Sequence, residues 1–383
     1  MADILNQFLK LFENFQYLQW NQIAMWIIGG VLIFLAIKKE MEPTLLLPMG
    51  LGAILVNLPI NPEEAGEGIN GVLNHLFNMG MTHESFELFP LLLFIGIGAM
   101  IDFGPVLSSP KLMIFGAAAQ FGIFFTLCLG LLVGFDLNDA ASAAIIGAAD
   151  GPTSIVVAQT LNSKYMGAIM VAAYSYMALV PVVQPPIIRL CTTKKERMIR
   201  MSNAGGKPVS KLTKILFPIV VTIIVGLFAP GSVAPVGFLM FGNLLRECGV
   251  LDSLSETAQK VLANLITILL GISVASQMTA DKFLTWETIL ILGLGLAAFV
   301  FDTVGGVMLA KFMNLFLPQG KKINPMIGAA GISAFPMSGR VVHKMGLEED
   351  PQNFLLMHSI GVNVSGQVAS VIAGGIILAM VQG

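Results

Sequence analysis

The eight residues GAADGPTS, from Gly147 to Ser154, decide the fold, because they interrupt an apolar segment that covers residues 139–161. Glycine and proline both break a regular helix, and Asp150 stands in the middle of the interruption. In a membrane, an irregular backbone is tolerated only where it is buried in protein or lines a water-filled site. The stretch therefore predicts a broken helix that brings a carboxylate to a functional site.

The composition of the whole chain places that segment in a membrane. Of the 383 residues, 55% are hydrophobic and only 11% are charged, against roughly 25% charged in soluble domains. The apolar residues form continuous blocks, whereas a membrane β-barrel would show short alternating segments. The net charge of −2 excludes a nucleic-acid-binding surface, and the 3 Cys and 4 His lack the spacing of metal or redox sites. We expect an all-α polytopic membrane protein.

Hydrophobic periodicity and length divide the chain into twelve apolar segments. They cover about residues 21–37, 44–59, 88–101, 112–134, 139–161, 165–190, 212–229, 234–245, 258–277, 286–317, 323–339 and 352–381. The first twenty residues are amphipathic and lack the basic start and cleavage site of a signal peptide. The expected organisation is an interfacial amphipathic helix at 1–20, a first membrane repeat at 21–190, a basic cytoplasmic loop at 191–211 and a second membrane repeat at 212–383.

The distribution of charge indicates which loops face the cytoplasm. The positive-inside rule places loop 191–211 inside because it is rich in Lys and Arg, whereas the stretch Asn61–Glu87 has five Glu and no Lys or Arg. If segments 139–161 and 165–190 both crossed the membrane, the basic loop would lie outside. One of them must therefore be re-entrant, and the broken segment at 139–161 is the better candidate.

The second half of the chain repeats the order of the first. Leu93–Ala99 (LFIGIGA) resembles Leu269–Ala275 (LLGISVA). Further on, Ile146–Asp150 (IGAAD) matches Ile327–Gly331 (IGAAG), which makes 323–339 a second broken segment. The charges give the second half the opposite orientation. Transporters built from such inverted-topology repeats hold their site where two broken helices meet near the membrane midplane.

Asp150 is the leading candidate for function, since an ionisable residue inside a membrane segment usually marks an ion or proton path. The structural alternative is an Asp that caps a half-helix, and the two readings are compatible. Neutral oxygens accompany it from the two broken segments and their surroundings: Thr153, Ser154, Tyr176, Asn324, Ser333 and Ser338. Oxygen ligands alone suit a hard cation such as Na⁺. Taken alone, a hydroxyl in such a segment more often joins neighbouring helices than binds an ion.

Two further charged residues stand out. Asp302 lies deep in an apolar segment, where a partner is expected for it, and the repeat aligns it with Gln120. Arg340 ends the second broken segment and could pair with either aspartate or with an incoming anion. It could also be a cytoplasmic anchor under the positive-inside rule, and both readings stay open.

Four strings carry a resemblance to a known family. They are GAADGPTSIVVAQ (Gly147–Gln159), AAYSYMALVP (Ala172–Pro181), NPMIGAAGISAFPMSGRVVHK (Asn324–Lys344) and MHSIGVNVSGQVASVIAGG (Met357–Gly375). With these strings the chain resembles, over nearly its whole length, the β subunit of the sodium-pumping biotin-dependent decarboxylases. This group includes glutaconyl-CoA, methylmalonyl-CoA and oxaloacetate decarboxylases.

The resemblance implies a concrete activity. Carboxybiotin carried by a partner subunit would be decarboxylated at the cytoplasmic face while Na⁺ is exported and a proton is consumed. The chain has no biotin-attachment string of the AMKM type, so biotin would come from a carrier subunit. A carboxyltransferase (α) subunit and a small membrane subunit would complete an oligomeric complex, in contact with lipid in the cytoplasmic membrane of a prokaryote.

The resemblance also implies roles for single residues. Asp150 would be the Na⁺- and proton-coupled carboxylate, with Tyr176 close to it, and Asn324 and Ser333 would bind Na⁺ with it or relay a proton. Arg340 would meet carboxybiotin. Further site residues follow from the motifs and their neighbourhood: Gly151 and Gly328 for close backbone approach, Thr153 for Na⁺ or proton binding, and Asn363 more remotely. Asp302 lies outside the four strings, and its expected role in Na⁺ or proton binding rests on its place in an apolar segment.

Two other functions fit parts of the pattern. A stand-alone secondary Na⁺-coupled transporter would share the inverted repeat, the two broken segments and the buried Asp. Arg340 together with the full motif strings favours the decarboxylase. A plain membrane anchor for a soluble complex would not need two polar clusters inside the membrane.

Overall fold

The computed structural model describes residues 12–40, 43–60, 68–82, 88–201, 209–318 and 320–382. Within these ranges the chain forms helices joined by turns, and no strand occurs in them. Seven of the described helices are long and apolar enough to cross a membrane: Trp20–Lys38, Pro110–Val133, Met166–Cys191, Lys211–Phe228, Asp252–Ala275, Trp286–Phe316 and Leu356–Gln382. The prediction of an all-α polytopic membrane protein is confirmed.

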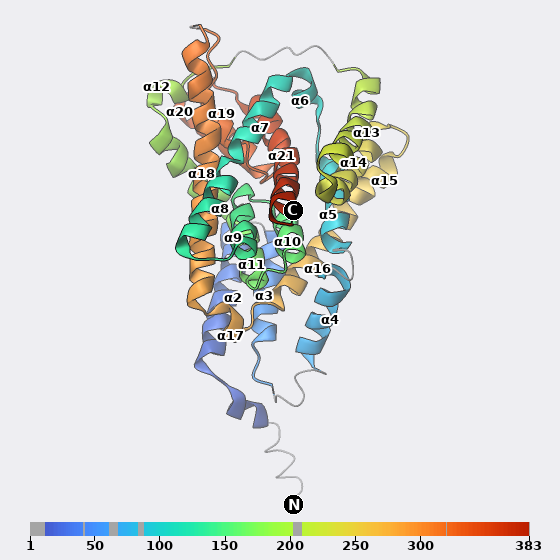
Figure 1. Cartoon of the computed structure of the whole chain (residues 1–383), viewed down its shortest axis with the longest axis vertical. Coiled ribbons are helices and arrows are strands. Elements are labelled where there is room, and N and C mark those ends of the chain that lie inside the picture. Colours follow the sequence, from blue (N-terminus) through green and yellow to red (C-terminus); the bar gives the residue numbers. More distant parts are fainter. Residues whose placement is uncertain are drawn as a thin grey trace, which may run out of the picture. The chain divides into compact units, whose positions relative to one another are not determined.

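The helices follow the expected segments closely. In chain order they are η1 (Glu13–Tyr17), α2 (Trp20–Lys39), α3 (Pro43–Val56), α4 (Ile69–Met81), α5 (Leu88–Met100), α6 (Gly104–Ser108), η3 (Pro110–Leu112), α7 (Met113–Ala119), α8 (Phe121–Val133), α9 (Leu137–Ala144), η4 (Ile145–Ala148), α10 (Gly151–Thr160), α11 (Met166–Cys191), α12 (Lys194–Arg197), α13 (Lys211–Phe228), η5 (Pro230–Ser232), α14 (Val233–Glu247), α15 (Asp252–Glu256), η6 (Thr257–Leu262), α16 (Ala263–Ala275), α17 (Ala280–Phe283), α18 (Trp286–Phe316), α19 (Met326–Ala329), α20 (Met337–Glu349) and α21 (Leu356–Gln382). Figure 1 shows this succession.

The chain divides into two compact units. Unit 1 consists of Met1–Phe89 and Asn264–Leu290, and unit 2 of Pro90–Ala263 and Ile291–Gly383. Each unit therefore combines a stretch from the first half of the sequence with a stretch from the second half. Most of the expected N-terminal interfacial helix lies outside the described residues, which begin just before the short η1.

Unit 1 is held together by a buried asparagine between two distant stretches of sequence. The Asn57 side chain donates to the carbonyl oxygens of Ala53, at 2.8 Å, and Met278, at 2.7 Å. Its Oδ1 accepts from the backbone N–H of Ala280 at 2.8 Å. The end of α3 is thus bonded to both sides of the turn before α17. The sequence did not predict α4, which lies in the acidic stretch 61–87.

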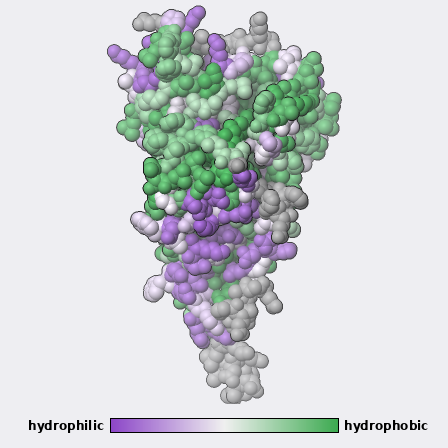
Figure 2. All heavy atoms as spheres, in the orientation of Figure 1, coloured by the Kyte–Doolittle hydropathy of each residue, from purple (hydrophilic) through white to green (hydrophobic). Residues whose placement is uncertain are grey.

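Unit 2 contains helices that approach one another very closely. A Cβ added to Gly98 on α5 would overlap the carbonyl oxygen of Leu239 on α14, and one added to Gly242 would overlap that of Ile95. Such reciprocal contacts need glycine and are typical of helix packing in membranes. The outer face of α13 carries exposed apolar residues such as Ile223. Figure 2 shows the hydrophobic cover over α13 and α14.

The end of unit 2 that contains α12 and the C-terminal end of α20 is rich in charge, and it is called the basic end here. Three ion pairs hold the end of α11 and the chain after it to the C-terminal end of α20 and the turn that follows. They are Arg189 with Glu348, Arg197 with Glu349 and Arg200 with Asp350. The loop 191–211, as far as it is described, is therefore paired with the C-terminal end of α20 and the turn after it.

Both predicted breaks are present, and a third was not foreseen. The first separates η4 from α10 at Ala149 and Asp150, and the second separates α19 from α20 over residues 330–336. The segment expected as one helix at 112–134 is also interrupted, because Gln120 divides α7 from α8.

Candidate functional site

The first break directs the Asp150 side chain into the interior of unit 2. Ala149 has left-handed backbone angles (φ 52°, ψ 43°), which turn the chain at the end of η4. Asp150 then caps α10, and its Oδ1 accepts from the backbone N–H of Thr153 at 3.3 Å. The residue is only 3% exposed. Asp150 is therefore both the cap of a half-helix and a buried carboxylate.

Three side chains donate to the other carboxylate oxygen of Asp150. Its Oδ2 accepts from Thr153 Oγ1 at 2.7 Å, from Ser370 Oγ at 3.0 Å and from Gln367 Nε2 at 3.2 Å. Thr153 was expected from the sequence, and the other two were missed. Hydrogen bonds of this kind compensate a buried charge, which would otherwise be costly.

A polar stripe on α21 could have revealed the missed residues. Asn363, Gln367 and Ser370 are four and three positions apart, a spacing that places them on one helix face. All three are buried. Asn363 Nδ2 donates to the carbonyl oxygen of Ile332 at 2.7 Å, while its Oδ1 has no partner among the described residues. The stripe therefore touches both breaks.

The two broken segments meet directly. The backbone N–H of Ser333 donates to the carbonyl oxygen of Ala148 at 2.9 Å. The Ser333 hydroxyl donates to the carbonyl oxygen of Gly366 on α21 at 3.2 Å. The breaks take backbone groups out of regular helical hydrogen bonding. The bond between Ser333 and Ala148 satisfies one such donor and one such acceptor.

Asn324 and Ser338 lie elsewhere than beside Asp150. Asn324 Nδ2 donates to the carbonyl oxygens of Arg197, at 2.8 Å, and Ile199, at 2.9 Å. Its Oδ1 accepts from the N–H of Met326 at 3.1 Å. The structure thus puts Asn324 at the basic end, where it fastens the start of α19. Ser338 pairs with Gln184 on α11.

Tyr174, rather than Tyr176, packs against the start of α10. A Cβ added to Gly151 would overlap the Tyr174 ring, so this close approach requires the glycine. The buried Tyr174 hydroxyl has no partner among the described residues. Tyr176 instead donates to the carbonyl oxygen of Leu292 at 2.6 Å. Residues two positions apart on a helix face different directions, so only one tyrosine can lie beside Asp150.

Gly328 on α19 packs closely against Gly306 on α18. A Cβ there would overlap the carbonyl oxygen of Gly306, and a Cβ on Gly306 would overlap that of Gly328. Hence α19 lies directly on α18.

Asp302 is fully buried on α18 and faces the third break. Its Oδ1 accepts from the backbone N–H of Ile123 at 3.2 Å, at the start of α8. Its Oδ2 has no partner among the described residues, and a Cβ added to Gly147 would lie 2.6 Å from it. Gln120, at the break itself, donates to the carbonyl oxygens of Gly116 and Gly331. The partner that the sequence led us to expect for Asp302 is thus a backbone amide.

Arg340 is exposed on α20. Its guanidinium makes no hydrogen bond or ion pair within the described ranges, although the acidic residues later on α20 and just beyond it are all paired. The Arg340 guanidinium, at the end of the second broken segment, is therefore available to bind an anion.

Comparisons with known proteins identify the family. A family model described as the Na⁺-transporting oxaloacetate decarboxylase beta subunit matches residues 21–381. The methylmalonyl-CoA decarboxylase subunit beta of Propionigenium modestum is 46% identical, over 96% of each chain. The glutaconyl-CoA decarboxylase subunit beta of Acidaminococcus fermentans is 44% identical, over 97% of this chain and 96% of the relative. A probable oxaloacetate decarboxylase beta chain of Vibrio cholerae is 43% identical, over 96% and 97% respectively. The broken membrane helices and their buried carboxylate are therefore those of a chain that belongs to the Na⁺-transporting oxaloacetate decarboxylase beta subunit family.

Proposed function

We propose that this protein is the membrane subunit of a primary sodium pump, in which the decarboxylation of carboxybiotin drives Na⁺ export and consumes a proton. Relatives named for three different decarboxylases match it at 46, 44 and 43% identity. The three substrates in these names differ, so a subunit common to all three enzymes must serve a later, shared step. Loss of CO₂ from carboxybiotin is such a step.

The proposed Na⁺ site is centred on Asp150, and the observation that carries it is the set of side-chain donors on this buried carboxylate. The Thr153 and Ser370 hydroxyls that donate to it can rotate and offer lone pairs to a cation instead. Na⁺ or a proton would each neutralise the buried charge, so the two can exchange on one site. Gln367 and Tyr174 border this site.

Ser333 and Asn324 are proposed on the path to this site. Ser333 ties the second break to the first through its backbone and to α21 through its hydroxyl. Asn324 fastens the other end of the same segment at the basic end. Asp302, with one unbonded carboxylate oxygen, is proposed as a separate proton-binding group.

Arg340 is proposed to receive the carboxylate of carboxybiotin. A guanidinium can bind a carboxylate through two parallel hydrogen bonds, and that of Arg340 is exposed and unpaired in the described part of the chain. In the reaction, the bond between the biotin nitrogen and the carboxyl carbon breaks and CO₂ leaves. The electron pair remains on the biotin unit, which takes up the proton.

The pump needs partners that this chain does not contain. We propose a carboxyltransferase subunit, a biotin carrier and a small membrane subunit, in the cytoplasmic membrane of a prokaryote, with the basic end inside. The composition of the two units from both halves of the sequence supports an inverted repeat. Movement of a repeat-built core against other helices would expose the site alternately to the two sides.

The test is ²²Na⁺ uptake into inverted vesicles that carry the whole complex, driven by the decarboxylation substrate. Asp150→Asn is expected to abolish both Na⁺ uptake and Na⁺-dependent decarboxylation. Survival of both would move the central carboxylate to Asp302. Na⁺ transport by the chain without any biotin-carrying partner would instead show a stand-alone secondary transporter.

A further inference from the structure

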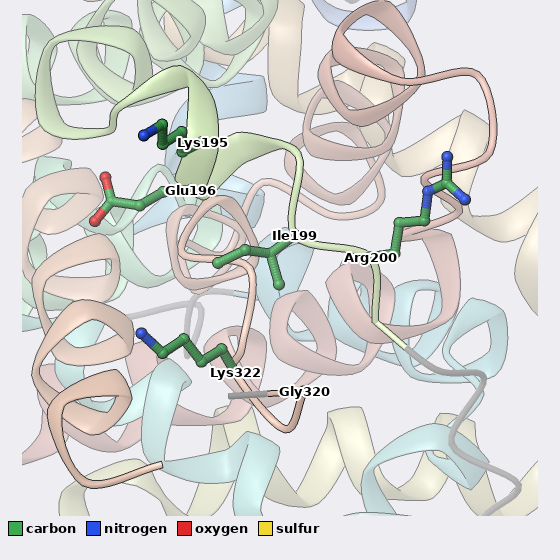
Figure 3. A pocket seen from close by; sticks show the side chains of 6 residues that line it. All are labelled: Lys195, Glu196, Ile199, Arg200, Gly320 and Lys322. Carbon is green, nitrogen blue, oxygen red and sulfur yellow. The ribbon is translucent and has the colours of Figure 1, made fainter. Parts of the chain in front are cut away.

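Two cavities at the basic end of unit 2 share three lining residues. The first, with a volume of about 340 Å³, is lined by Lys195, Glu196, Ile199, Arg200, Gly320 and Lys322 (Figure 3). The second, of about 320 Å³, shares Arg200, Gly320 and Lys322 and extends toward α7 and α18. The size of each lies at the lower end of the range for small-molecule sites.

Hydrogen bonds hold the backbone around Lys321 and Lys322. Gly320 has a positive φ of 93°, and the N–H of Lys321 donates to the carbonyl oxygen of Pro318 at 3.1 Å. Asn314 on α18 clamps Ile323 with two hydrogen bonds of 2.7 Å, one to its carbonyl oxygen and one from its N–H. These hydrogen bonds restrict the backbone at Lys321 and directly after Lys322, which favours binding by reducing the entropy lost.

The second cavity presents cations without counter-charges. Lys111, Lys321 and Lys322 line it, are exposed, and make no ion pair within the described ranges. Its described lining includes no Asp or Glu. Arg200 is already bonded to Asp350, and Figure 3 shows its side chain turned away from Lys322. The three lysine ammonium groups repel one another and favour an anion between them.

The floor of this cavity is apolar. It includes the buried Leu112, Phe115 and Ile327 and the half-buried Met313. Two candidate membrane spans end here, since one begins at Pro110 and the other runs to Phe316. In a bilayer crossed by these two spans, the cavity would lie near the level of the phospholipid phosphates.

We propose that this cavity is a binding site for the headgroup of an anionic phospholipid. The phosphate would lie among Lys111, Lys321 and Lys322, and the first carbons of the acyl chains would contact the apolar floor. Basic pockets between transmembrane helices at the cytoplasmic face bind such headgroups. The site does not depend on the proposed function, because it rests only on the cavity and its charges.

Occupancy of the site would act on the second broken segment. Ile323 and Ile327 line the cavity and flank Asn324, which bonds α19 to the loop after α12. A bound headgroup would therefore fix the outer end of this segment and stabilise one arrangement of it.

The test compares phospholipid retention by the assembled complex after delipidation, with native mass spectrometry as the readout. The probes are phosphatidylglycerol and phosphatidylcholine. The variant K111Q/K321Q/K322Q is expected to lose affinity for phosphatidylglycerol by roughly 100-fold, about fivefold for each lysine. Lys194→Gln is the matched control, because Lys194 is exposed on α12 but lines neither cavity. Equal retention of phosphatidylglycerol by wild type and triple variant would overturn the proposal.

Two further arms separate a phospholipid from other anions. Glycerol 3-phosphate, which lacks acyl chains, should not displace phosphatidylglycerol from the wild type; displacement at similar concentrations would show a site for free phosphate. In bilayers of phosphatidylcholine alone, the triple variant should keep the wild-type KM for carboxybiotin. A KM raised tenfold there would assign the cavity to the carboxylated substrate instead. Unchanged thermal unfolding of the variant in phosphatidylcholine checks that it folds.

Discussion

Asn363 and Gln367 lie one turn apart on α21, and each reaches a different broken segment. Asn363 donates to the carbonyl oxygen of Ile332 at 2.7 Å, while Gln367 donates to Oδ2 of Asp150 at 3.2 Å. A single rigid helix thus bonds both interruptions. Any shift of the second broken segment that moves α21 must therefore also move the Gln367 donor at Asp150. In this way α21 connects the second broken segment mechanically to the carboxylate of the first.

The first prediction concerns the residues on α21 that sequence reasoning missed. Ser370→Ala removes a donor to the Asp150 carboxylate and should raise the Na⁺ concentration for half-maximal decarboxylation roughly tenfold, as for one hydrogen bond to a charged group. Ser365→Ala is the control, since Ser365 is also buried on α21 but bonds only to backbone carbonyls. Equal Na⁺ dependence in both variants would remove Ser370 from the site.

The second prediction separates the two tyrosines. Tyr174→Phe should change the Na⁺ dependence of decarboxylation with little loss of stability, because its hydroxyl has no partner in the described part of the chain. Tyr176→Phe should lower the free energy of unfolding by about 1 kcal/mol, because its hydroxyl bonds to Leu292. Thermal unfolding and Na⁺ titration of both variants distinguish the tyrosine that affects Na⁺ binding from the tyrosine that stabilises the fold. The reverse pattern would return the role beside Asp150 to Tyr176.

The third prediction concerns Asp302. Asparagine resembles a protonated aspartic acid in shape, so Asp302→Asn should fold and keep its affinity for Na⁺. If Asp302 carries the proton, the pH dependence of decarboxylation should flatten in this variant. A tenfold loss of Na⁺ affinity with an unchanged pH profile would make Asp302 a Na⁺ ligand instead. The measurement is decarboxylation rate against pH at several Na⁺ concentrations.

The fourth prediction tests the contact between α18 and α19. Gly328→Ala places a Cβ on the Gly306 carbonyl oxygen and should prevent assembly or destabilise it by several kcal/mol, as overpacking against backbone does. Gly293→Ala, on α18, meets nothing within 4 Å and should be neutral or stabilising by up to about 1 kcal/mol. Detergent stability assays on the pair measure the difference, and a stable Gly328→Ala protein would refute the close approach.

The fifth prediction is a pH effect at the basic end. The hydrogen bond from Arg200 lowers the pKa of Asp350 below its ordinary value of 3.8. A carboxyl group with a lowered folded-state pKa stabilises the protein above its unfolded pKa and loses that effect as pH falls through the folded pKa. Asp350→Asn should therefore reduce thermal stability at neutral pH, and its difference from wild type should shrink below about pH 4. Glu348→Gln, in an exposed pair, serves as the comparison; a constant difference down to pH 2 would contradict this account.

The sequence revealed those parts of the fold that have local causes. Gly151 and Pro152 break the helix whatever surrounds them, and so the position of Asp150 at a break could be predicted. The break at Gln120 could not, because the group that accompanies it is distant: the N–H of Ile123 donates both to the Gln120 carbonyl oxygen and to Asp302, 182 residues beyond Gln120. Local signals do not report such a partner.

In the candidate site, too, the sequence predicts the residues with a local cause and misses those that are set by distant contacts. Thr153 belongs to the motif around Asp150 and was expected, and its hydroxyl does donate to the carboxylate. The choice between Tyr174 and Tyr176 depends on the rotation of α11 about its axis, which hydrophobic periodicity cannot settle when the helix is apolar on most sides. Asn324 was grouped with Asp150 through its motif, but its amide is already used by the carbonyls of Arg197 and Ile199.

The bond from the Ser333 N–H to the Ala148 carbonyl oxygen joins the two breaks through main-chain atoms alone. A side-chain substitution at either position leaves both atoms in place, and only proline at 333 would remove the donor. Most substitutions at these two positions therefore leave the bond between the two breaks intact, and the polar side chains around it can be substituted independently of it. An ion site built around this junction could be retuned for another cation by exchanging side chains, without taking the scaffold apart.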